Sequence, residues 1–219
     1  MNLYSKRNSL NNTSFLFVLF TLLFTFSIAS HAKSTKVLMY GDSVSAGYGM
    51  KTEQSWPYLL SQTFVTENAG INLVNASISG ETTGGGVARL ASVMKRQELN
   101  EGDWVILELG GNDGLRGFPI STLKTNLQLM IDQVKSHNVN VALMQVRIPP
   151  NYGKRYTTMF EDVYKDLAKT NSIKLLPFFM EKVAMNKNYM MPDGIHPNVS
   201  AQVIIRDEMK EVIESLIAD

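Results

Sequence analysis

The sequence of 219 residues contains no cysteine. This absence excludes disulfide bonds, catalysis by a thiolate and metal sites that use cysteine ligands. The chain also has no excess of charge of one sign, since 21 basic residues face 20 acidic ones and no basic stripe occurs. The electrostatic footprint of a nucleic-acid-binding protein is therefore missing, and we expect no nucleic acid among the partners.

Long apolar runs are scarce, and the one near the N-terminus is short. Lys6 and Arg7 precede an apolar stretch of 14 residues, from Phe15 to Ile28. A transmembrane helix needs about 20 residues, whereas a basic start followed by a short apolar segment is typical of a secretory signal peptide. An uncleaved N-terminal anchor is the alternative. The pattern favours cleavage of residues 1–32, export to the periplasm or the medium, and no stable membrane span afterwards.

The rest of the chain, residues 33–219, predicts a single domain. Without Lys6 and Arg7 it has 19 basic and 20 acidic residues, a net charge of −1. Its 187 residues match a typical domain of about 100–200 residues and suffice for a full hydrophobic core. No internal repeat or low-complexity linker interrupts it, and we expect a monomer.

Apolar runs of strand length alternate with helical patterns along this domain. The runs span residues 37–40, 71–75, 104–109, 139–145 and 173–176. The segments between them repeat apolar residues at helical spacing, as in Leu123, Leu127, Met130 and Val134. This alternation predicts βαβ units, in which helices cover both faces of a parallel sheet.

Small and polar residues follow the ends of these predicted strands. The relevant segments are Gly41-Asp42-Ser43, the loop up to Gly80, Gly111-Asn112-Asp113, and Asp193-Gly194-Ile195-His196 just before the last helix. In open α/β sheets, ligands bind at the carboxyl ends of the strands. These segments are therefore expected to meet at one edge of the sheet and to form a site there.

Ser43 is the candidate nucleophile, and it needs a base because an isolated hydroxyl is a weak nucleophile at neutral pH. Beyond residue 32 the only histidines are His137 and His196. His137 ends a helical stripe, where the helix dipole favours it, so we expect a structural role. His196 follows Asp193 by three residues, which fits helix capping but also lets the carboxylate orient the ring toward Ser43. We predict a Ser43–His196–Asp193 triad, with Pro197 as the first residue of the last helix.

Two residues are candidate donors for an oxyanion hole, which stabilises the negative charge that develops on a substrate oxygen. Gly80 offers a backbone N–H and Asn112 offers a side-chain amide. Taken singly, each is also an ordinary turn residue. Their place on the same sheet edge as Ser43 favours the catalytic role. Asp42 and Asp113 are expected to fix loops by hydrogen bonds rather than to act in catalysis.

The segments that carry these residues resemble the conserved blocks of the SGNH (GDSL) hydrolases. They are residues 41–48, 74–80, 108–117, 177–180 and 193–198. The similarity is greatest to bacterial periplasmic members that act as thioesterases, lysophospholipases and arylesterases. It implies a flavodoxin-like three-layer α/β/α sandwich with strand order 2-1-3-4-5. It also implies that the N–H of Ser43 joins Gly80 and Asn112 in the oxyanion hole.

The same resemblance implies which side chains surround the acyl group of the substrate. They are Val44, Ile148, Tyr152 and Ile195. These apolar residues suit a fatty acyl chain better than a sugar. The glycine-rich segment 110–119 adds Leu115 and Phe118, which predict an apolar lid over the ligand.

We therefore predict a metal-free and cofactor-free enzyme that hydrolyses fatty acyl thioesters, lysophospholipids and aryl esters through an acyl-enzyme. Scattered carboxylates and a single available base provide no set of metal ligands. A carbohydrate or aryl ester deacetylase with the same residues is the nearest alternative. Another is a non-catalytic phosphate- or flavin-binding module that uses residues 41–49. That module lacks the G-x-x-x-x-G-K-[ST] motif and leaves the Asp193–His196 pair unexplained.

Overall fold

The computed structural model describes residues 34–218, so the predicted signal peptide lies outside the described residues and its cleavage stays a prediction. Residues 34–218 form five strands: β1 (Thr35–Gly41), β2 (Ile71–Asn75), β3 (Trp104–Glu108), β4 (Asn140–Met144) and β5 (Lys174–Leu176). Neighbouring strands are all parallel, and their order is β2-β1-β3-β4-β5. Both the predicted parallel sheet and the strand order are confirmed.

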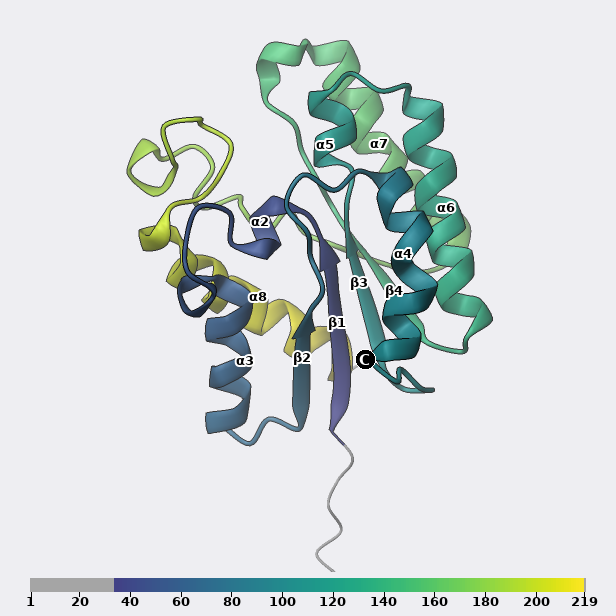
Figure 1. Cartoon of the computed structure of the whole chain (residues 1–219). Helices are drawn as coiled ribbons and strands as arrows, with labels where there is room; N and C mark the ends of the chain where they lie inside the picture. The colour runs from purple at the N-terminus through teal and green to yellow at the C-terminus, as the bar shows by residue number, and fades with distance from the viewer. Residues whose placement is uncertain (1–33, 219) are drawn as a thin grey trace, which may run out of the picture. The chain divides into compact units, whose positions relative to one another are not determined.

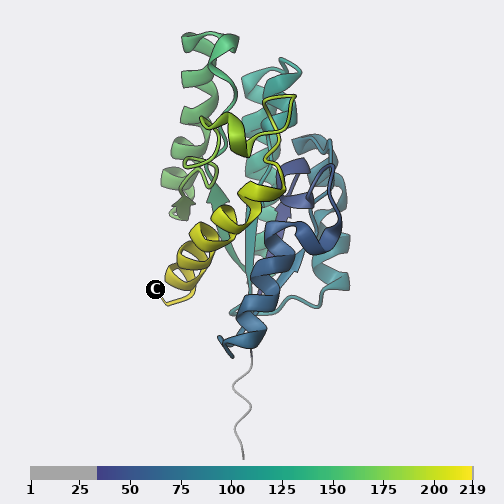
Figure 2. The same cartoon turned by 90° about the vertical axis from the view of Figure 1, so that its left-hand side faces the viewer.

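Helices cover both faces of this sheet (Figures 1 and 2). They are α2 (Ser43–Ala46), α3 (Trp56–Thr66), α4 (Thr83–Arg96), α5 (Gly111–Leu115), α6 (Ile120–Ser136), α7 (Lys154–Asn171) and α8 (Val199–Ala218), with short 3-10 turns η1 (Thr52–Gln54), η2 (Pro150–Tyr152) and η3 (Lys187–Tyr189). In Figure 1, α3 and α8 lie on one side of the strands, and α4, α6 and α7 lie on the other. The three-layer α/β/α sandwich is therefore confirmed. Among the described residues, no helix is both long enough and apolar enough to span a bilayer.

The inner strand β1 shows why residues 37–40 are apolar at every position. Leu38 and Tyr40 pack into the core under α4, α6 and α7, whereas Val37 and Met39 pack into the core under α3 and α8. All four side chains are fully buried. Side chains alternate between the two faces of a strand, so a strand covered on both faces needs apolar residues throughout. A polar residue directly after β1 is therefore forced to the edge of the sheet.

The last helix begins at Val199, so the prediction that Pro197 is its first residue is wrong. Pro197 instead pairs with Met190 in an isolated antiparallel bridge. The side-chain oxygen of Asn198 accepts the N–H of Ala201 at 3.3 Å. This capping contact sets the start of the helix. The bridge anchors the chain one residue after His196.

The glycine-rich segment 110–119 is partly helical, because it contains α5. Gly110 has a φ of 124°, and a Cβ atom there would overlap the hydroxyl of Tyr164. A Cβ atom on Gly114 would lie 2.7 Å from Ile148 and 2.8 Å from Phe160. These glycines therefore allow α5 to pack closely against α7 and the loop after β4. Movement of the segment as a lid stays a prediction.

Candidate active site

Ser43 is the first residue of α2, directly beyond the carboxyl end of β1. Asp42 caps this short helix, and its Oδ1 accepts the N–H of Val44 at 3.2 Å. Gly47 ends the helix in the left-handed conformation, with φ of 76°. The turn is thus fixed at both ends, which holds Ser43 at the edge of the sheet with 9% of its surface exposed.

His196 lies between Ser43 and Asp193. Its Nε2 is 2.8 Å from the Oγ of Ser43, and its Nδ1 is 2.7 Å from Oδ2 of Asp193. A carboxylate only accepts hydrogen bonds, so Nδ1 carries the hydrogen and Nε2 of the neutral ring accepts from the serine hydroxyl. The structure therefore brings together the three residues that the sequence suggested for a triad.

The loop around Asp193 keeps its carboxylate ionised. Oδ1 accepts the backbone N–H of Ile195 at 2.9 Å and that of His196 at 3.0 Å. Partial burial alone would raise the pKa of Asp193, but hydrogen bonds from the His196 side chain and these two N–H groups outweigh it and lower the pKa to about 2. The negative charge that orients His196 is therefore present at every pH near neutrality.

The two candidate oxyanion donors come from different segments: Gly80 lies in the loop after β2, and Asn112 lies in α5. Asn112 donates from Nδ2 to Oδ2 of Asp42 at 3.1 Å and lines the cavity beside Ser43. Gly80 has a φ of 79°, and within the described part of the chain its N–H has no hydrogen-bond partner. The guanidinium of Arg116 donates to the carbonyl oxygen of Gly80 at 3.2 Å, which ties the loop to α5.

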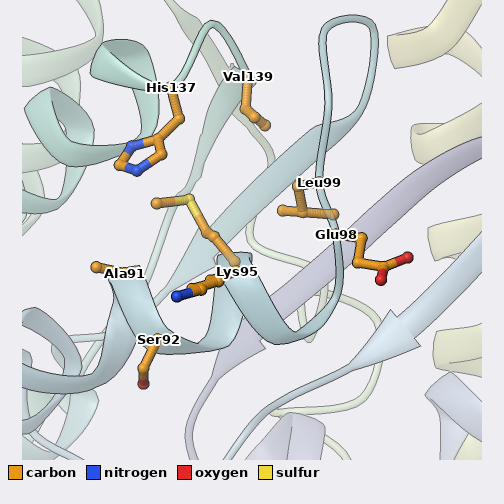
Figure 3. A pocket seen from close by; sticks show the side chains of 8 residues that line it. Ala91, Ser92, Lys95, Glu98, Leu99, His137 and Val139 are labelled. Carbon is orange, nitrogen blue, oxygen red and sulfur yellow. The ribbon is translucent and has the colours of Figure 1, made fainter.

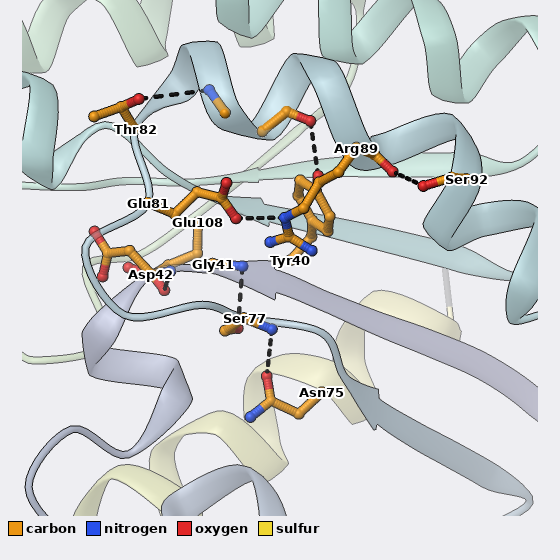
Figure 4. A network of polar contacts seen from close by, with 12 residues as sticks. Tyr40, Gly41, Asp42, Asn75, Ser77, Glu81, Thr82, Arg89, Ser92 and Glu108 are labelled. Carbon is orange, nitrogen blue, oxygen red and sulfur yellow. Dashed lines mark hydrogen bonds and ion pairs between the residues drawn. The ribbon is translucent and has the colours of Figure 1, made fainter.

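A polar network holds the loop that carries Gly80 (Figure 4). The N–H of Gly41 donates to Oγ of Ser77 at 3.1 Å, and the N–H of Ser77 donates to the side-chain oxygen of Asn75 at 3.1 Å. Farther along, Arg89 pairs with Glu81 and lies 4.1 Å above the ring of Tyr40. The loop is thus attached both to the end of β1 and to α4.

A cavity of about 360 Å³ opens beside Ser43, His196 and Asn112. Four of the predicted substrate-binding residues line it: Val44, Leu115, Ile148 and Ile195. The other two, Phe118 and Tyr152, do not line it. Both are exposed, and the hydroxyl of Tyr152 donates to the carbonyl oxygen of Leu115 at 2.9 Å. Their direct contact with substrate stays a prediction.

A second cavity, of about 530 Å³, lies elsewhere, between α4 and the start of β4 (Figure 3). His137 lines it, and Nδ1 of its ring is 2.8 Å from the carbonyl oxygen of Gln133. His137 also forms the C-cap of α6, as its position in the sequence suggested. No carboxylate of the described residues bonds to its ring, so this cavity has no second triad. The described residues also contain no cluster of three or more His, Cys, Asp or Glu side chains able to hold a metal.

Several site residues were missed by the sequence reasoning. Tyr48 places its ring 4.3 Å from that of His196, centre to centre. Glu108 is 3% exposed and lies behind the nucleophile. It ends an otherwise apolar strand, and this was the available signal. A third group comes from the chain between β5 and α8, which lacks regular periodicity: Phe178, Phe179, Met180, Met185 and Met190 line the cavity.

A parallel α/β/α sandwich with serine, histidine and aspartate in hydrogen-bond contact at the carboxyl edge of its sheet is the architecture of an SGNH-type hydrolase. The family model of GDSL-like lipases and acylhydrolases matches residues 39–203, and the chain belongs to this family.

Similar proteins support the same assignment. An arylesterase of Vibrio mimicus is 48% identical over 181 residues, which cover 83% of this chain and 88% of that protein. The thioesterase 1/protease 1/lysophospholipase L1 of Escherichia coli K12 is 43% identical over 199 residues, or 91% of each chain. Among solved structures, the psychrotrophic esterase EstA of a Pseudoalteromonas species, inhibited by monoethylphosphonate, superposes with a TM-score of 0.81 at 40% identity. The match covers 84% of this chain and all of that one.

Proposed function

We propose that this protein hydrolyses acyl esters and thioesters through an acyl-enzyme formed on Ser43. The observation that carries the proposal is the continuous contact from Ser43 Oγ to His196 Nε2 at 2.8 Å and from His196 Nδ1 to Asp193 at 2.7 Å. His196 takes the serine proton as Oγ attacks the carbonyl carbon, and Asp193 stabilises the imidazolium that forms. His196 then protonates the leaving alcohol or thiol, and water repeats the sequence to release the acid.

The oxyanion of each tetrahedral intermediate is bound by the N–H groups of Ser43 and Gly80 and by the amide of Asn112. Ser43 begins α2, so its N–H precedes the hydrogen-bonded part of the helix. The N–H of Gly80 has no partner within residues 34–218. Asn112 uses one N–H on Asp42 and keeps the other for substrate. Three preorganised donors at a partly buried site stabilise charge that develops only during reaction.

The acyl group occupies the apolar part of the cavity. Ile148 and Ile195 line it together with Phe178, Met180 and Met190. An acetyl group would leave most of the 360 Å³ empty, so this cavity favours a longer acyl chain over the substrate of a deacetylase. The names of the relatives, arylesterase and thioesterase/lysophospholipase, fit acyl esters and thioesters of this kind. Hydrolysis of p-nitrophenyl esters and acyl-CoA thioesters from C2 to C16, together with lysophosphatidylcholine, tests the proposal. Rates highest for acetyl esters would contradict it.

The pH dependence of activity is expected to include the loss of His196 as a base. As pH falls, His196 becomes protonated and no longer accepts the proton of Ser43, so kcat/KM declines on the acid side. Asp193 does not set this decline, because its low pKa of about 2 keeps it ionised throughout. Rates of a soluble short-chain ester from pH 4 to 9 provide the measurement. A matched His137→Gln variant and added EDTA should leave the profile unchanged. A shift caused by either would contradict the metal-free, single-base scheme.

We also propose that the protein is exported, that residues 1–32 are removed, and that the mature chain is a monomer. The support is the basic start and the short apolar stretch of the precursor. We expect intact mass analysis of the periplasmic or secreted protein to give a chain beginning at Lys33, and light scattering to give the mass of one copy. A product that keeps Phe15–Ile28 and sediments with membranes would indicate an anchor instead.

A further inference from the structure

Asp42 contacts both α2, which begins with Ser43, and α5, which carries Asn112. Its Oδ1 accepts the N–H of Val44 at 3.2 Å, while its Oδ2 accepts Nδ2 of Asn112 at 3.1 Å. Asp42 is 4% exposed, so this contact is shielded from water. A carboxylate has no hydrogen to donate, so only the nitrogen end of the Asn112 amide can face it. The contact therefore selects one of the two orientations of the amide.

A second acid, Glu108, lies next to Asp42 (Figure 4). Its Oε2 accepts the hydroxyl of Ser45 at 2.7 Å and the N–H of Asp42 at 3.4 Å. A Cβ atom at Gly41 would overlap this oxygen, so the glycine at the end of β1 makes room for the acid. No basic side chain pairs with Glu108 among its described contacts. A buried acid without a cation is stable chiefly in its neutral form.

We propose that Asp42 is a positioning residue that holds Asn112 with its amide nitrogen toward the substrate oxygen, and that Glu108 supports it as a neutral, protonated acid. This inference rests on the proposed role of Asn112 in the oxyanion hole. Asp42 itself touches no substrate and acts through Asn112. Two ionised carboxylates behind the oxyanion would destabilise it by repulsion. A neutral Glu108 avoids this, because it adds no second negative charge to that of Asp42.

The groups around Asp42 and Glu108 favour an ionised Asp42 and a protonated Glu108. Burial raises the pKa of Asp42, and Asp113 adds to the rise, whereas the N–H of Val44, the nearby His196 and the amide of Asn112 favour its ionised form. Burial and the neighbouring Asp42 raise the pKa of Glu108 well above its usual value; the Ser45 hydroxyl and the Asp42 N–H oppose the rise, but no positive charge does. Asp42 therefore holds the negative charge of the pair near neutral pH.

The test is a double-mutant cycle between Asp42→Asn and Asn112→Ala. Asn at position 42 keeps the size of the side chain but also presents N–H donors, so the Asn112 amide loses its single orientation. We expect kcat to fall about 10- to 100-fold with KM changed less than twofold, below the about 10²–10³ expected for loss of the donor itself. In the Asn112→Ala background, Asp42→Asn should cost less than threefold, because the group it positions is gone.

The acid side of the pH profile gives an independent readout. A protonated Asp42 resembles Asn, because it can donate a hydrogen bond. Protonation of Asp42 should therefore lower the kcat of the wild type in addition to protonation of His196, and log kcat should fall with decreasing pH more steeply than the slope of one that a single proton gives. In Asp42→Asn the decline should follow a single proton. Glu108→Gln imitates the neutral acid and should lower kcat less than Asp42→Asn does. A large loss in Glu108→Gln would contradict the neutral assignment.

Asp103→Asn is the matched control, since Asp103 is also a buried acid with two backbone donors. It is 2% exposed and accepts the N–H groups of Lys36 and Asn100, at the opposite end of β3. The Asp103→Asn variant should have lower thermal stability and an unchanged kcat. Combined with Asn112→Ala, it should leave the loss of kcat caused by Asn112→Ala the same. Asp42→Ser repeats the test if Asp42→Asn folds poorly, because serine keeps an oxygen that can cap α2 but is too short to reach Asn112. For every variant, kcat is calculated from the concentration of active sites, determined by titration.

The outcomes separate this inference from the proposed function. If Asn112→Ala lowers kcat strongly but Asp42→Asn is neutral, or costs the same in both backgrounds, the positioning role is wrong and the oxyanion hole stands. If Asn112→Ala itself leaves kcat unchanged, the oxyanion role of Asn112 fails first. The inference is supported if Asp42→Asn lowers kcat in the wild type but much less in the Asn112→Ala background, and if the acid decline of kcat in Asp42→Asn follows a single proton.

Discussion

Ser43→Ala is expected to abolish hydrolysis of esters and thioesters while the protein stays folded. In another serine hydrolase, loss of the nucleophile lowers kcat by about 10⁶, and we expect a loss of this order here. The remaining rate would come from water attacking a substrate polarised by the oxyanion donors. The hydroxyl of Ser43 bonds only to His196 among the described residues, and it lies at the edge of the sheet outside both apolar cores. Stability should therefore change by less than about 1 kcal/mol.

Labelling with a serine-directed phosphonate provides the direct measurement for Ser43. We expect the wild type to gain one phosphonyl group on Ser43, located by peptide mass spectrometry, and Ser43→Ala to gain none. Ser45→Ala is a useful comparison, because the hydroxyl of Ser45 points to Glu108 and not to His196. It should still be labelled at Ser43. A label on Ser45 or Ser79 would show that the nucleophile is assigned wrongly.

Asn112→Ala is expected to cost the second largest loss of activity. Its amide meets the substrate oxygen mainly when that oxygen becomes anionic, so its contribution appears in the transition state rather than in substrate binding. Removal of one such donor in other hydrolases lowers kcat by about 10²–10³, which corresponds to about 2.7–4 kcal/mol. We expect a loss of this size in kcat, little change in KM, and slower but continued phosphonate labelling of Ser43.

Asp113→Asn is the matched control for this variant. Asp113 is the neighbouring residue, but its carboxylate accepts the N–H and the hydroxyl of Thr83, at 2.8 and 2.5 Å, and so fixes the start of α4. It should lower the melting temperature more than kcat. If Asn112→Ala behaves in that same way, the residue belongs to the turn alone, and Gly80 and the Ser43 N–H are the only donors.

From the sequence alone, the class of fold could be predicted, together with the candidate residues of the site. Alternating apolar runs and helical stripes predicted a doubly covered parallel sheet, and the structure has strands within two residues of those positions. Local turn chemistry marked Ser43, Asn112 and Asp193 at the ends of these elements. This succeeded because burial on both faces leaves polar residues little room except at the sheet edge.

Which of these residues lie in contact could be read only from the folded structure. Ser43 and His196 are 153 positions apart, and their 2.8 Å contact depends on how β1 and the chain before α8 come together. The contact between Asp42 and Asn112 likewise joins the ends of two neighbouring strands, β1 and β3. The irregular chain between β5 and α8 supplies much of the cavity wall, yet it has no periodicity from which its side-chain directions follow. Periodicity reports how a segment meets the core, whereas contacts between loops depend on the packing of every layer beneath them.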